Sequence, residues 1–173
     1  MYYLTPKHSV AINKKVASSA IARAILEEFY PHVYQGIINQ FDGKPGFNEW
    51  QRFCPKSHLP HLPVVLIIRN PVDRFCTAVQ QVKTTVEEAL NGLETNTLWA
   101  LNEHFLHQYP LIEDKDFTLF RFEDINKAAD YLGIKIRLLN KARREKPILT
   151  VDQETRVRKY YEKDVELYNS CLE

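Results

Sequence analysis

The sequence predicts an α/β fold with a mainly parallel central sheet flanked by helices, in a single domain over residues 1–173. Short apolar runs that suit buried strands alternate along the chain with segments whose apolar residues recur at helical spacing, an order typical of parallel sheets. The chain also has no repeat, low-complexity tract or linker, and its length fits one domain of about 100–200 residues.

Composition and charge argue against several classes of protein. The 23 Lys and Arg residues nearly balance 22 Asp and Glu residues, so we expect no nucleic-acid partner and no anionic membrane surface as partner. Cys54, Cys76 and Cys171 have irregular spacing without a CxxC pair, which indicates reduced thiols. The sequence has no signal-peptide pattern and no run near the ~20 apolar residues of a membrane helix. We therefore expect a cytoplasmic protein.

The first half of the chain predicts a strand, a helix and two further strands. A short apolar run over residues 9–13 precedes a helix that begins at Ser18, and a second strand is predicted over residues 33–39. A turn-rich stretch follows at residues 42–46. Residues 64–68 form the clearest strand, because all five are apolar, as in a parallel strand covered on both faces.

Signals for the start of a helix follow the clearest strand directly. Asn70 suits the N-cap, Pro71 suits the first helical position, and Asp73 stands where a capping-box acid reaches back to the cap. The spacing predicts a helix whose buried stripe comprises Phe75, Val79, Val82 and Val86.

The second half predicts a helix, a strand and two further helices. Residues 98–109 are predicted to be helical, residues 117–122 to form a strand and residues 123–132 to form another helix. The last helix begins at Thr150, which has the capping-box spacing to Gln153.

Small and basic residues gather where the first strand gives way to a helix. Residues 13–19 read Asn-Lys-Lys-Val-Ala-Ser-Ser. Small residues let the backbone approach an anion, the helix N-terminus offers N–H groups, and Ser18 and Ser19 add hydroxyls beside the charge of Lys15. The segment suits a phosphate or sulfate, or else is a solvated lysine pair before a serine-capped helix. The GxxxxGK[ST] pattern is absent, which disfavours magnesium-ATP chemistry.

A second candidate anion site follows residues 64–68. Arg69 leaves that strand at the sheet edge, and Thr77 lies two turns into the next helix on the face of Asp73 and Arg74. Arg69 and Thr77 are placed to hold one phosphate from two sides; the alternative is a capped helix with a surface ion pair from Asp73 to Arg74 or Arg69. Ligands of parallel α/β sheets bind at this edge.

Both segments resemble motifs of the sulfotransferases that use 3′-phosphoadenosine 5′-phosphosulfate (PAPS). Residues 15–19 resemble the PKxGxT-like 5′-phosphosulfate loop, with Ala17 in place of a glycine. Residues 69–77 resemble the 3′-phosphate motif RxPxxRxxS, with Thr77 in place of the serine. Residues 120–125 resemble the family's [YF]-E-D-[LI] element, and the likeness runs in family order from about residue 8 to the C-terminus.

The resemblance implies a three-layer, P-loop-like sulfotransferase fold that transfers a sulfuryl group from PAPS to the hydroxyl or amine of a small-molecule or carbohydrate acceptor. No metal is expected in such a transfer, which depends on positioning and charge stabilisation. Lys15 is the implied catalytic group that stabilises charge on the leaving oxygen. The implied cofactor-binding residues are Lys15, Val16, Ala17, Ser18 and Ser19 at the 5′ end and Arg69 and Thr77 at the 3′-phosphate.

The resemblance also indicates a base and a closing loop. Residues 56–60 resemble the K-T-H-L-P segment that bears the catalytic histidine of cytosolic sulfotransferases, which makes His58 the first candidate to take the acceptor proton. A parallel crossover needs roughly a dozen residues, so the short link to the strand at Val64 places His58 at the opposite end of the sheet unless the connector runs back. The competing bases are His32, Asp42 and Glu49. The basic run Arg143, Arg144 and Lys146 is either a solvated loop or a segment that closes over the phosphates.

Two other functions fit the same residues. The first is a catalytically inactive nucleotide-binding module of the same fold, and the second is an atypical nucleotide kinase. Replacing Lys15 with alanine separates an enzyme from a module, because only an enzyme has turnover to lose. A preference for ATP-magnesium over 3′,5′-ADP would favour the kinase.

Overall fold

The computed structural model describes six stretches of the chain: residues 2–11, 16–56, 61–97, 102–111, 117–137 and 145–171. The strands are β1 (Tyr2–Leu4), β2 (Ser9–Ala11), β3 (Val64–Ile68) and β4 (Phe117–Arg121). The helices are α1 (Ser18–Phe29), α2 (Pro31–Gln40), α3 (Phe47–Phe53), α4 (Pro71–Val82), α5 (Val86–Glu94), α6 (Ile125–Leu132), α7 (Val151–Tyr160) and α8 (Glu162–Ser170). Two short 3₁₀ turns are η1 (Tyr109–Leu111) and η2 (Phe122–Asp124). The α/β class predicted from the sequence is therefore confirmed.

The four strands form one mixed sheet in the order β1-β2-β3-β4. β2 pairs with β3 and β3 pairs with β4 in parallel, whereas β1 pairs with β2 in the antiparallel sense. The expected mainly parallel arrangement thus holds for two of the three pairings and fails at β1. β1 has three residues, too few for a periodic pattern, and the sequence did not predict it.

The sheet is built around β3, all five residues of which are buried. Val65 and Ile67 share an apolar cluster with α1 and α6, while Val64 and Leu66 on the other face pack with Leu167 of α8. Burial on both faces explains the continuous apolar run, since a strand exposed on one face would alternate.

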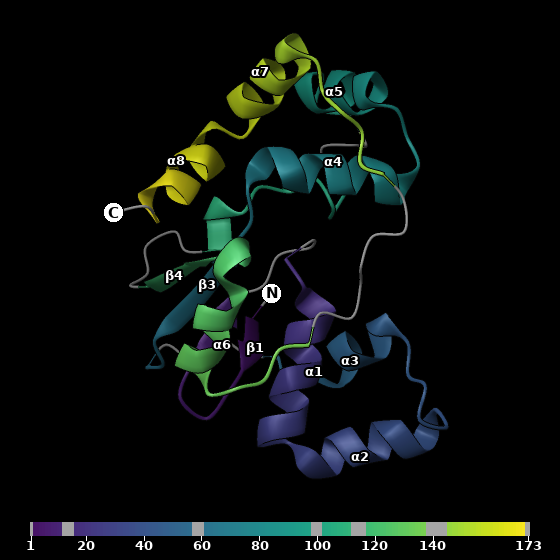
Figure 1. Ribbon diagram of the computed structural model, residues 1–173, viewed down its shortest axis with the longest axis vertical. Coiled ribbons are helices and arrows are strands. Elements are labelled where there is room, and N and C mark those ends of the chain that lie inside the picture. Colours follow the sequence, from purple (N-terminus) through teal and green to yellow (C-terminus); the bar gives the residue numbers. More distant parts are fainter. Residues whose placement is uncertain are drawn as a thin grey trace.

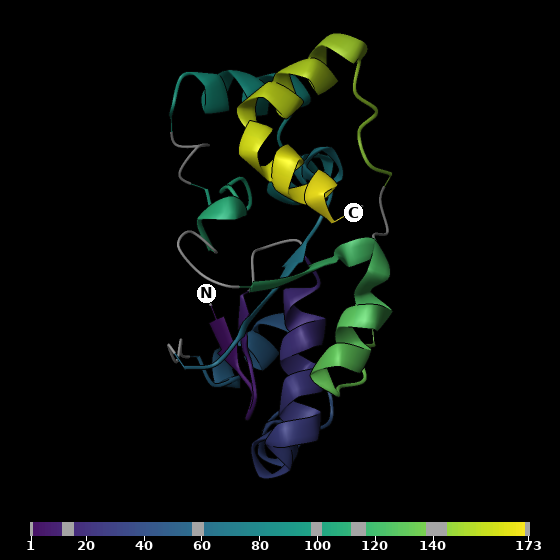
Figure 2. The ribbon, with the colours of Figure 1, turned by 90° about the vertical axis from the view of Figure 1, so that its left-hand side faces the viewer.

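A second group of helices lies beyond the carboxyl end of β3. Figures 1 and 2 show α4, α5, α7 and α8 packed together there, while α1 and α6 lie beside the strands and α2 and α3 pack against α1. The group has an apolar cluster of its own that includes Phe75, Leu90, Phe105 and Val157. None of the helices formed by the described residues combines the length and the apolar character needed to cross a bilayer.

Two local predictions are wrong. Residues 33–39, predicted as a strand, belong to the helix α2, which begins at Pro31 and buries Ile37 in the cluster beside α1. The β-branched residues there favour a strand locally, but the buried contact decides the outcome. Residues 102–108, predicted to be helical, form turns instead, and residues 98–101 of the same prediction lie outside the described residues.

Two predicted helices each end earlier than expected. α4 ends at Lys83, which adopts a left-handed conformation with φ 61°, and Thr85 and Glu88 then form a capping box that begins α5. The capping box at Thr150 and Gln153 is confirmed, but the helix it begins gives way to α8 at Tyr161. The apolar stripe continues across both breaks, which is why periodicity did not locate them.

Candidate functional site

The parallel pairing of β2 with β3 brings two strand-to-helix connections to one edge of the sheet. Ala11 at the end of β2 lies opposite Leu66 in β3, so the chain leaves these two strands in the same direction. α1 begins at Ser18 after β2, and α4 begins at Pro71 after β3. Lys15, the implied catalytic group, lies outside the described residues. The described parts of the two candidate segments therefore follow neighbouring strands, as predicted.

The backbone at the start of α1 has a conformation suited to an anion. Ala17 is the N-cap and has left-handed dihedral angles, φ 58° and ψ 29°, whereas Ser18 is already helical. Consecutive residues of opposite hand direct neighbouring N–H groups to one side, and the helix N-terminus adds a partial positive charge. Alanine at this position carries strain that glycine would avoid.

The two serines that begin α1 are both bound by one side chain from α3. Gln51 Nε2 donates to Ser18 Oγ at 3.0 Å and to Ser19 Oγ at 2.6 Å. A hydroxyl that accepts a hydrogen bond keeps its own proton for an acceptor such as a phosphate oxygen. Gln51 thus orients both hydroxyls, a role that no sequence pattern indicated because α3 meets α1 only through tertiary packing.

The start of α4 is capped as predicted, except for one residue. Asn70 Oδ1 accepts from the N–H groups of Val72 and Asp73 at 3.0 and 3.3 Å. Asp73 was expected to reach back to the cap, but its carboxylate is held by two cations instead. Arg69 and Lys146 compete for it more strongly than a backbone N–H group does, because charge-assisted hydrogen bonds are stronger than neutral ones.

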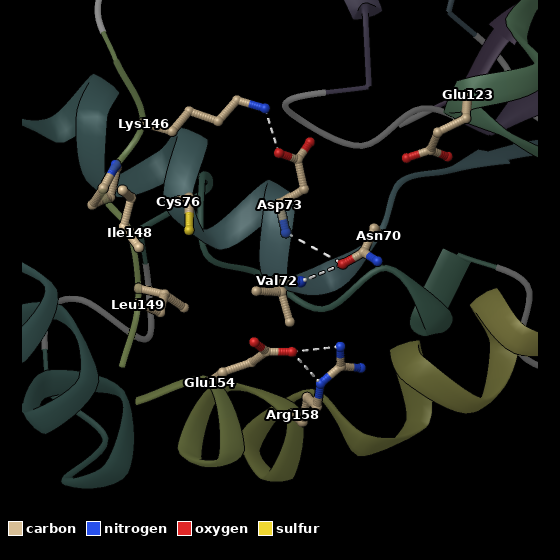
Figure 3. A pocket seen from close by; sticks show the side chains of 11 residues that line it. Asn70, Val72, Asp73, Cys76, Glu123, Lys146, Ile148, Leu149, Glu154 and Arg158 are labelled. Carbon is tan, nitrogen blue, oxygen red and sulfur yellow. Dashed lines mark hydrogen bonds and ion pairs between the residues drawn. The ribbon is translucent and has the colours of Figure 1, made fainter. Parts of the chain in front are cut away.

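The two cations that bind the Asp73 carboxylate are far apart in the sequence. Arg69 Nε and Nη2 each lie 2.5 Å from Asp73 Oδ2, and the Arg69 guanidinium stacks over the Phe122 ring at 4.8 Å. Lys146, from the segment before α7, donates to Asp73 Oδ1 (Figure 3). The Arg69 side chain is 11% exposed and that of Asp73 is 33% exposed. The ion pair with Arg69 matches the alternative drawn from the sequence.

The two cations also set the protonation state of Asp73. Partial burial acts to raise the pKa of Asp73, but the hydrogen bond from Lys146 and the charge of Arg69 outweigh burial and hold the pKa below its ordinary value. The carboxylate is therefore ionised at neutral pH. Arg69 and Lys146 already share an anion that belongs to the chain itself.

Thr77 lies one turn further along α4 and is engaged by the same residue. Its Oγ1 donates to the main-chain oxygen of Asp73 at 2.9 Å, a bond that threonine often makes inside helices. Asp73 therefore contacts both Arg69 and Thr77, the residues implied to hold one phosphate. A ligand phosphate between them would replace contacts that Asp73 now makes.

A cavity of about 500 Å³ opens next to Asp73. It lies between α4, α7 and the segment that carries Lys146, with Glu123 at its rim (Figure 3). Arg158 lines the floor of the cavity and binds Glu154 at 2.6 Å on the same helix. The volume is within the range of about 300–1,000 Å³ that is usual for small-molecule sites. The lining residues are Asn70, Val72, Asp73, Cys76, Glu123, Lys146, Pro147, Ile148, Leu149, Glu154 and Arg158.

Arg74 has a structural position away from this cavity. The sequence left open a surface pair between Asp73 and Arg74, which is wrong, because the Arg74 side chain is 1% exposed. Its guanidinium donates to the main-chain oxygens of His104 and Leu106 at 3.2 and 2.5 Å. Arg74 thus ties α4 to the turns over residues 102–108, and it does not line the cavity.

The candidate bases are not gathered at this edge by the described contacts. His58 lies outside the described residues. His32 lies in the first turn of α2, next to the C-terminal end of α1, and the 12 residues of α1 separate its ends by about 18 Å. Asp42 lies beyond the other end of α2. Glu49 shares α3 with Gln51, but residues two apart on a helix point in different directions.

Metal and thiol chemistry find no support among the described residues. No group of three His, Cys, Asp or Glu side chains in that part of the chain could hold a metal ion. Cys54, Cys76 and Cys171 are free thiols, and burial raises the pKa of Cys54 to about 12. A thiol that stays protonated at neutral pH is a poor nucleophile.

No protein-family model matches the chain, and no curated protein or solved structure gives a significant match. The case for a function is therefore made by the residues at this edge of the sheet.

Replacing Ala17 with glycine is expected to stabilise the protein by about 1 kcal/mol. The left-handed conformation destabilises a folded protein by about 1–2 kcal/mol when the residue is not glycine. Glycine removes that strain, but its greater freedom in the unfolded chain lowers the free energy of unfolding by about 0.4–1 kcal/mol. Urea unfolding measures the change. The matched control is Ala22→Gly in the interior of α1, which should destabilise by about 1 kcal/mol. Destabilisation by both substitutions would contradict the left-handed N-cap.

Replacing Asp73 with asparagine is expected to tighten the binding of inorganic phosphate by about tenfold or more. The substitution removes the carboxylate that competes with an incoming anion for Arg69 and Lys146, and one charge interaction near a protein surface is worth at least about 1.4 kcal/mol, or tenfold. Isothermal titration calorimetry measures the affinity. Glu154→Gln is the control, because it removes one negative charge from the same cavity without touching Arg69. Equal gains in both variants would show a general field effect and exclude direct competition.

Proposed function

We propose that the chain binds PAPS at the carboxyl edge of β2 and β3 and transfers the sulfuryl group to the hydroxyl or amine of a small-molecule or carbohydrate acceptor. The observation that carries the proposal is the placement of two oriented serine hydroxyls and an arginine at the ends of adjacent parallel strands. PAPS carries an anionic group at each end of one ribose, which matches two anion sites side by side. The proposal includes the three-layer, P-loop-like sulfotransferase fold that the sequence resembles.

The start of α1 is the proposed site of the 5′-phosphosulfate. Ser18 and Ser19, oriented by Gln51, donate to its oxygens together with the N–H groups that follow Ala17. Val16 is fully buried and fixes the loop against the core.

The start of α4 is the proposed site of the 3′-phosphate. The phosphate replaces the Asp73 carboxylate between Arg69 and Lys146, and it accepts a hydrogen bond from the Thr77 hydroxyl. A phosphate with more charge than a carboxylate gains more from two cations, which drives the exchange. The neighbouring cavity of about 500 Å³ has room for the adenosine.

The chemical step is an in-line displacement at sulfur. The acceptor oxygen or nitrogen forms a bond to sulfur while the bond from sulfur to the bridging oxygen breaks, and 3′,5′-ADP leaves. A base takes the acceptor proton, for which His58 is the first candidate. Lys15 stabilises the negative charge that grows on the bridging oxygen. These roles for Lys15 and His58 follow from the family resemblance alone.

The wild-type chain is expected to bind 3′,5′-ADP at least tenfold more tightly than 5′-AMP, which differs from it only in lacking the 3′-phosphate. Arg69→Gln should abolish most of that preference, because a charged hydrogen bond is worth about 1.5–3 kcal/mol, or roughly 10- to 100-fold. Calorimetric titration of both nucleotides measures it. The control Arg158→Gln removes a cation from the same cavity and should keep the preference within about threefold. Equal affinities for the two nucleotides, or tighter binding of ATP-magnesium, would refute the 3′-phosphate site.

Replacing Lys15 with alanine is expected to lower the rate of sulfuryl transfer by about 100- to 1,000-fold, the usual loss when one donor to a developing oxyanion is removed. The dissociation constant for 3′,5′-ADP should change by less than about tenfold. The release of 3′,5′-ADP from PAPS in a panel of hydroxyl and amine acceptors measures the rate, with Lys14→Ala as the neighbouring control. Tight binding of 3′,5′-ADP without turnover by the wild-type chain would favour the second candidate, an inactive nucleotide-binding module.

A further inference from the structure

A side chain from a distant part of the chain binds the main chain of Arg69. The Arg69 N–H donates to Gln108 Oε1 at 3.1 Å, and Gln108 Nε2 donates to the Arg69 carbonyl oxygen at 3.0 Å. The pairing of β3 with β4 ends one residue earlier, at Ile68 and Arg121. The Gln108 amide thus binds the main chain of the first residue beyond β3, at the point where the candidate anion site begins.

Gln108 is in turn held by a buried carboxylate on α8. Both oxygens of Asp164 accept from the Gln108 N–H at 2.9 Å, and Oδ1 also accepts from the Tyr109 N–H at 2.9 Å. Gln108 and Asp164 are both fully buried. A buried carboxylate is tolerated only where such donors and a counter-charge surround it, so these bonds specify how α8 docks.

The counter-charge comes from α4 and encloses the same turn. Arg74 Nη2 lies 3.9 Å from Asp164 Oδ2, and the Arg74 guanidinium stacks over the Tyr161 ring at 5.2 Å. The Tyr161 hydroxyl donates to the Phe105 carbonyl oxygen at 2.6 Å. The turn that carries Gln108 is therefore fixed from α4 and from the start of α8 together.

We infer that Gln108 and Asp164 are positioning residues for Arg69, so that the anion site forms only while α8 is docked. Without the Gln108 amide, the Arg69 main chain loses two hydrogen bonds just beyond β3, and the start of the arginine side chain is held less firmly. The inference rests on the proposed function only for the identity of the anion. The link from α8 to Arg69 is independent of it.

The test compares Gln108→Met with Tyr161→Phe. Methionine matches the length of glutamine and removes both bonds to Arg69 while leaving the main-chain N–H for Asp164. Phenylalanine removes one buried hydrogen bond in the same turn without touching Arg69. Both variants should melt a few degrees below the wild type. Only Gln108→Met should weaken 3′,5′-ADP binding, by about tenfold or more, and speed hydrogen exchange of the Arg69 amide by about tenfold or more.

Equal affinities and equal Arg69 exchange in the two variants would show that Gln108 has a structural role only, and would overturn the inference. The exchange readout needs no ligand, so a wild-type chain that fails to bind 3′,5′-ADP refutes the proposed function and leaves this comparison intact.

A measurement on the wild-type chain covers the case in which Gln108→Met does not fold. In native-state hydrogen exchange, the amides of Arg69, Gln108 and Tyr109 should share one opening free energy and one dependence on denaturant concentration. Both values should be lower than those of the β3 amides that precede Arg69. If the Arg69 amide instead exchanges at the same free energy as the β3 amides, and at a different one from Gln108 and Tyr109, the docking of α8 does not control the position of Arg69.

Discussion

The parallel register between β2 and β3 is the constraint on which the rest of the candidate site depends. Because Ala11 lies opposite Leu66, the chain leaves both strands at the same edge, and α1 and α4 are the helices that follow. The five buried residues of β3 fix this register, since a slip of one residue would exchange the side chains of the two covered faces. The packing of the apolar core therefore also determines that α1 and α4 follow strands that end at the same edge of the sheet.

Charge at this edge is balanced within the chain. Arg69 and Lys146 converge on Asp73, and the carboxylate keeps them in place without a ligand. Such an arrangement preorganises the two cations, but any incoming anion must replace a partner that is already bound. A singly charged anion gains little from the exchange, whereas a phosphate gains more. On the proposed function, Asp73 therefore favours a multiply charged anion over a singly charged one.

The sequence by itself determined the roles of residues whose partners lie nearby along the chain. Asn70 caps α4 and Thr150 caps α7 because a short polar side chain before an apolar pattern has a backbone N–H group within reach. The burial of β3 and the strand-to-helix order likewise follow from neighbours along the chain. The positions of Ser18 and Arg69 at one edge could be predicted for the same reason, given parallel strands.

Tertiary structure alone decided which side chains complete the site. Gln51 reaches Ser18 and Ser19 across 32 or 33 positions of sequence, and Asp164 reaches Gln108 across 56. No local pattern marks such residues, because a glutamine or an aspartate becomes a specific partner only when packing brings a buried polar group next to it. The sequence thus determined which residues follow the two neighbouring strands and which acid can pair with Arg69, and long-range packing decided how these residues are held.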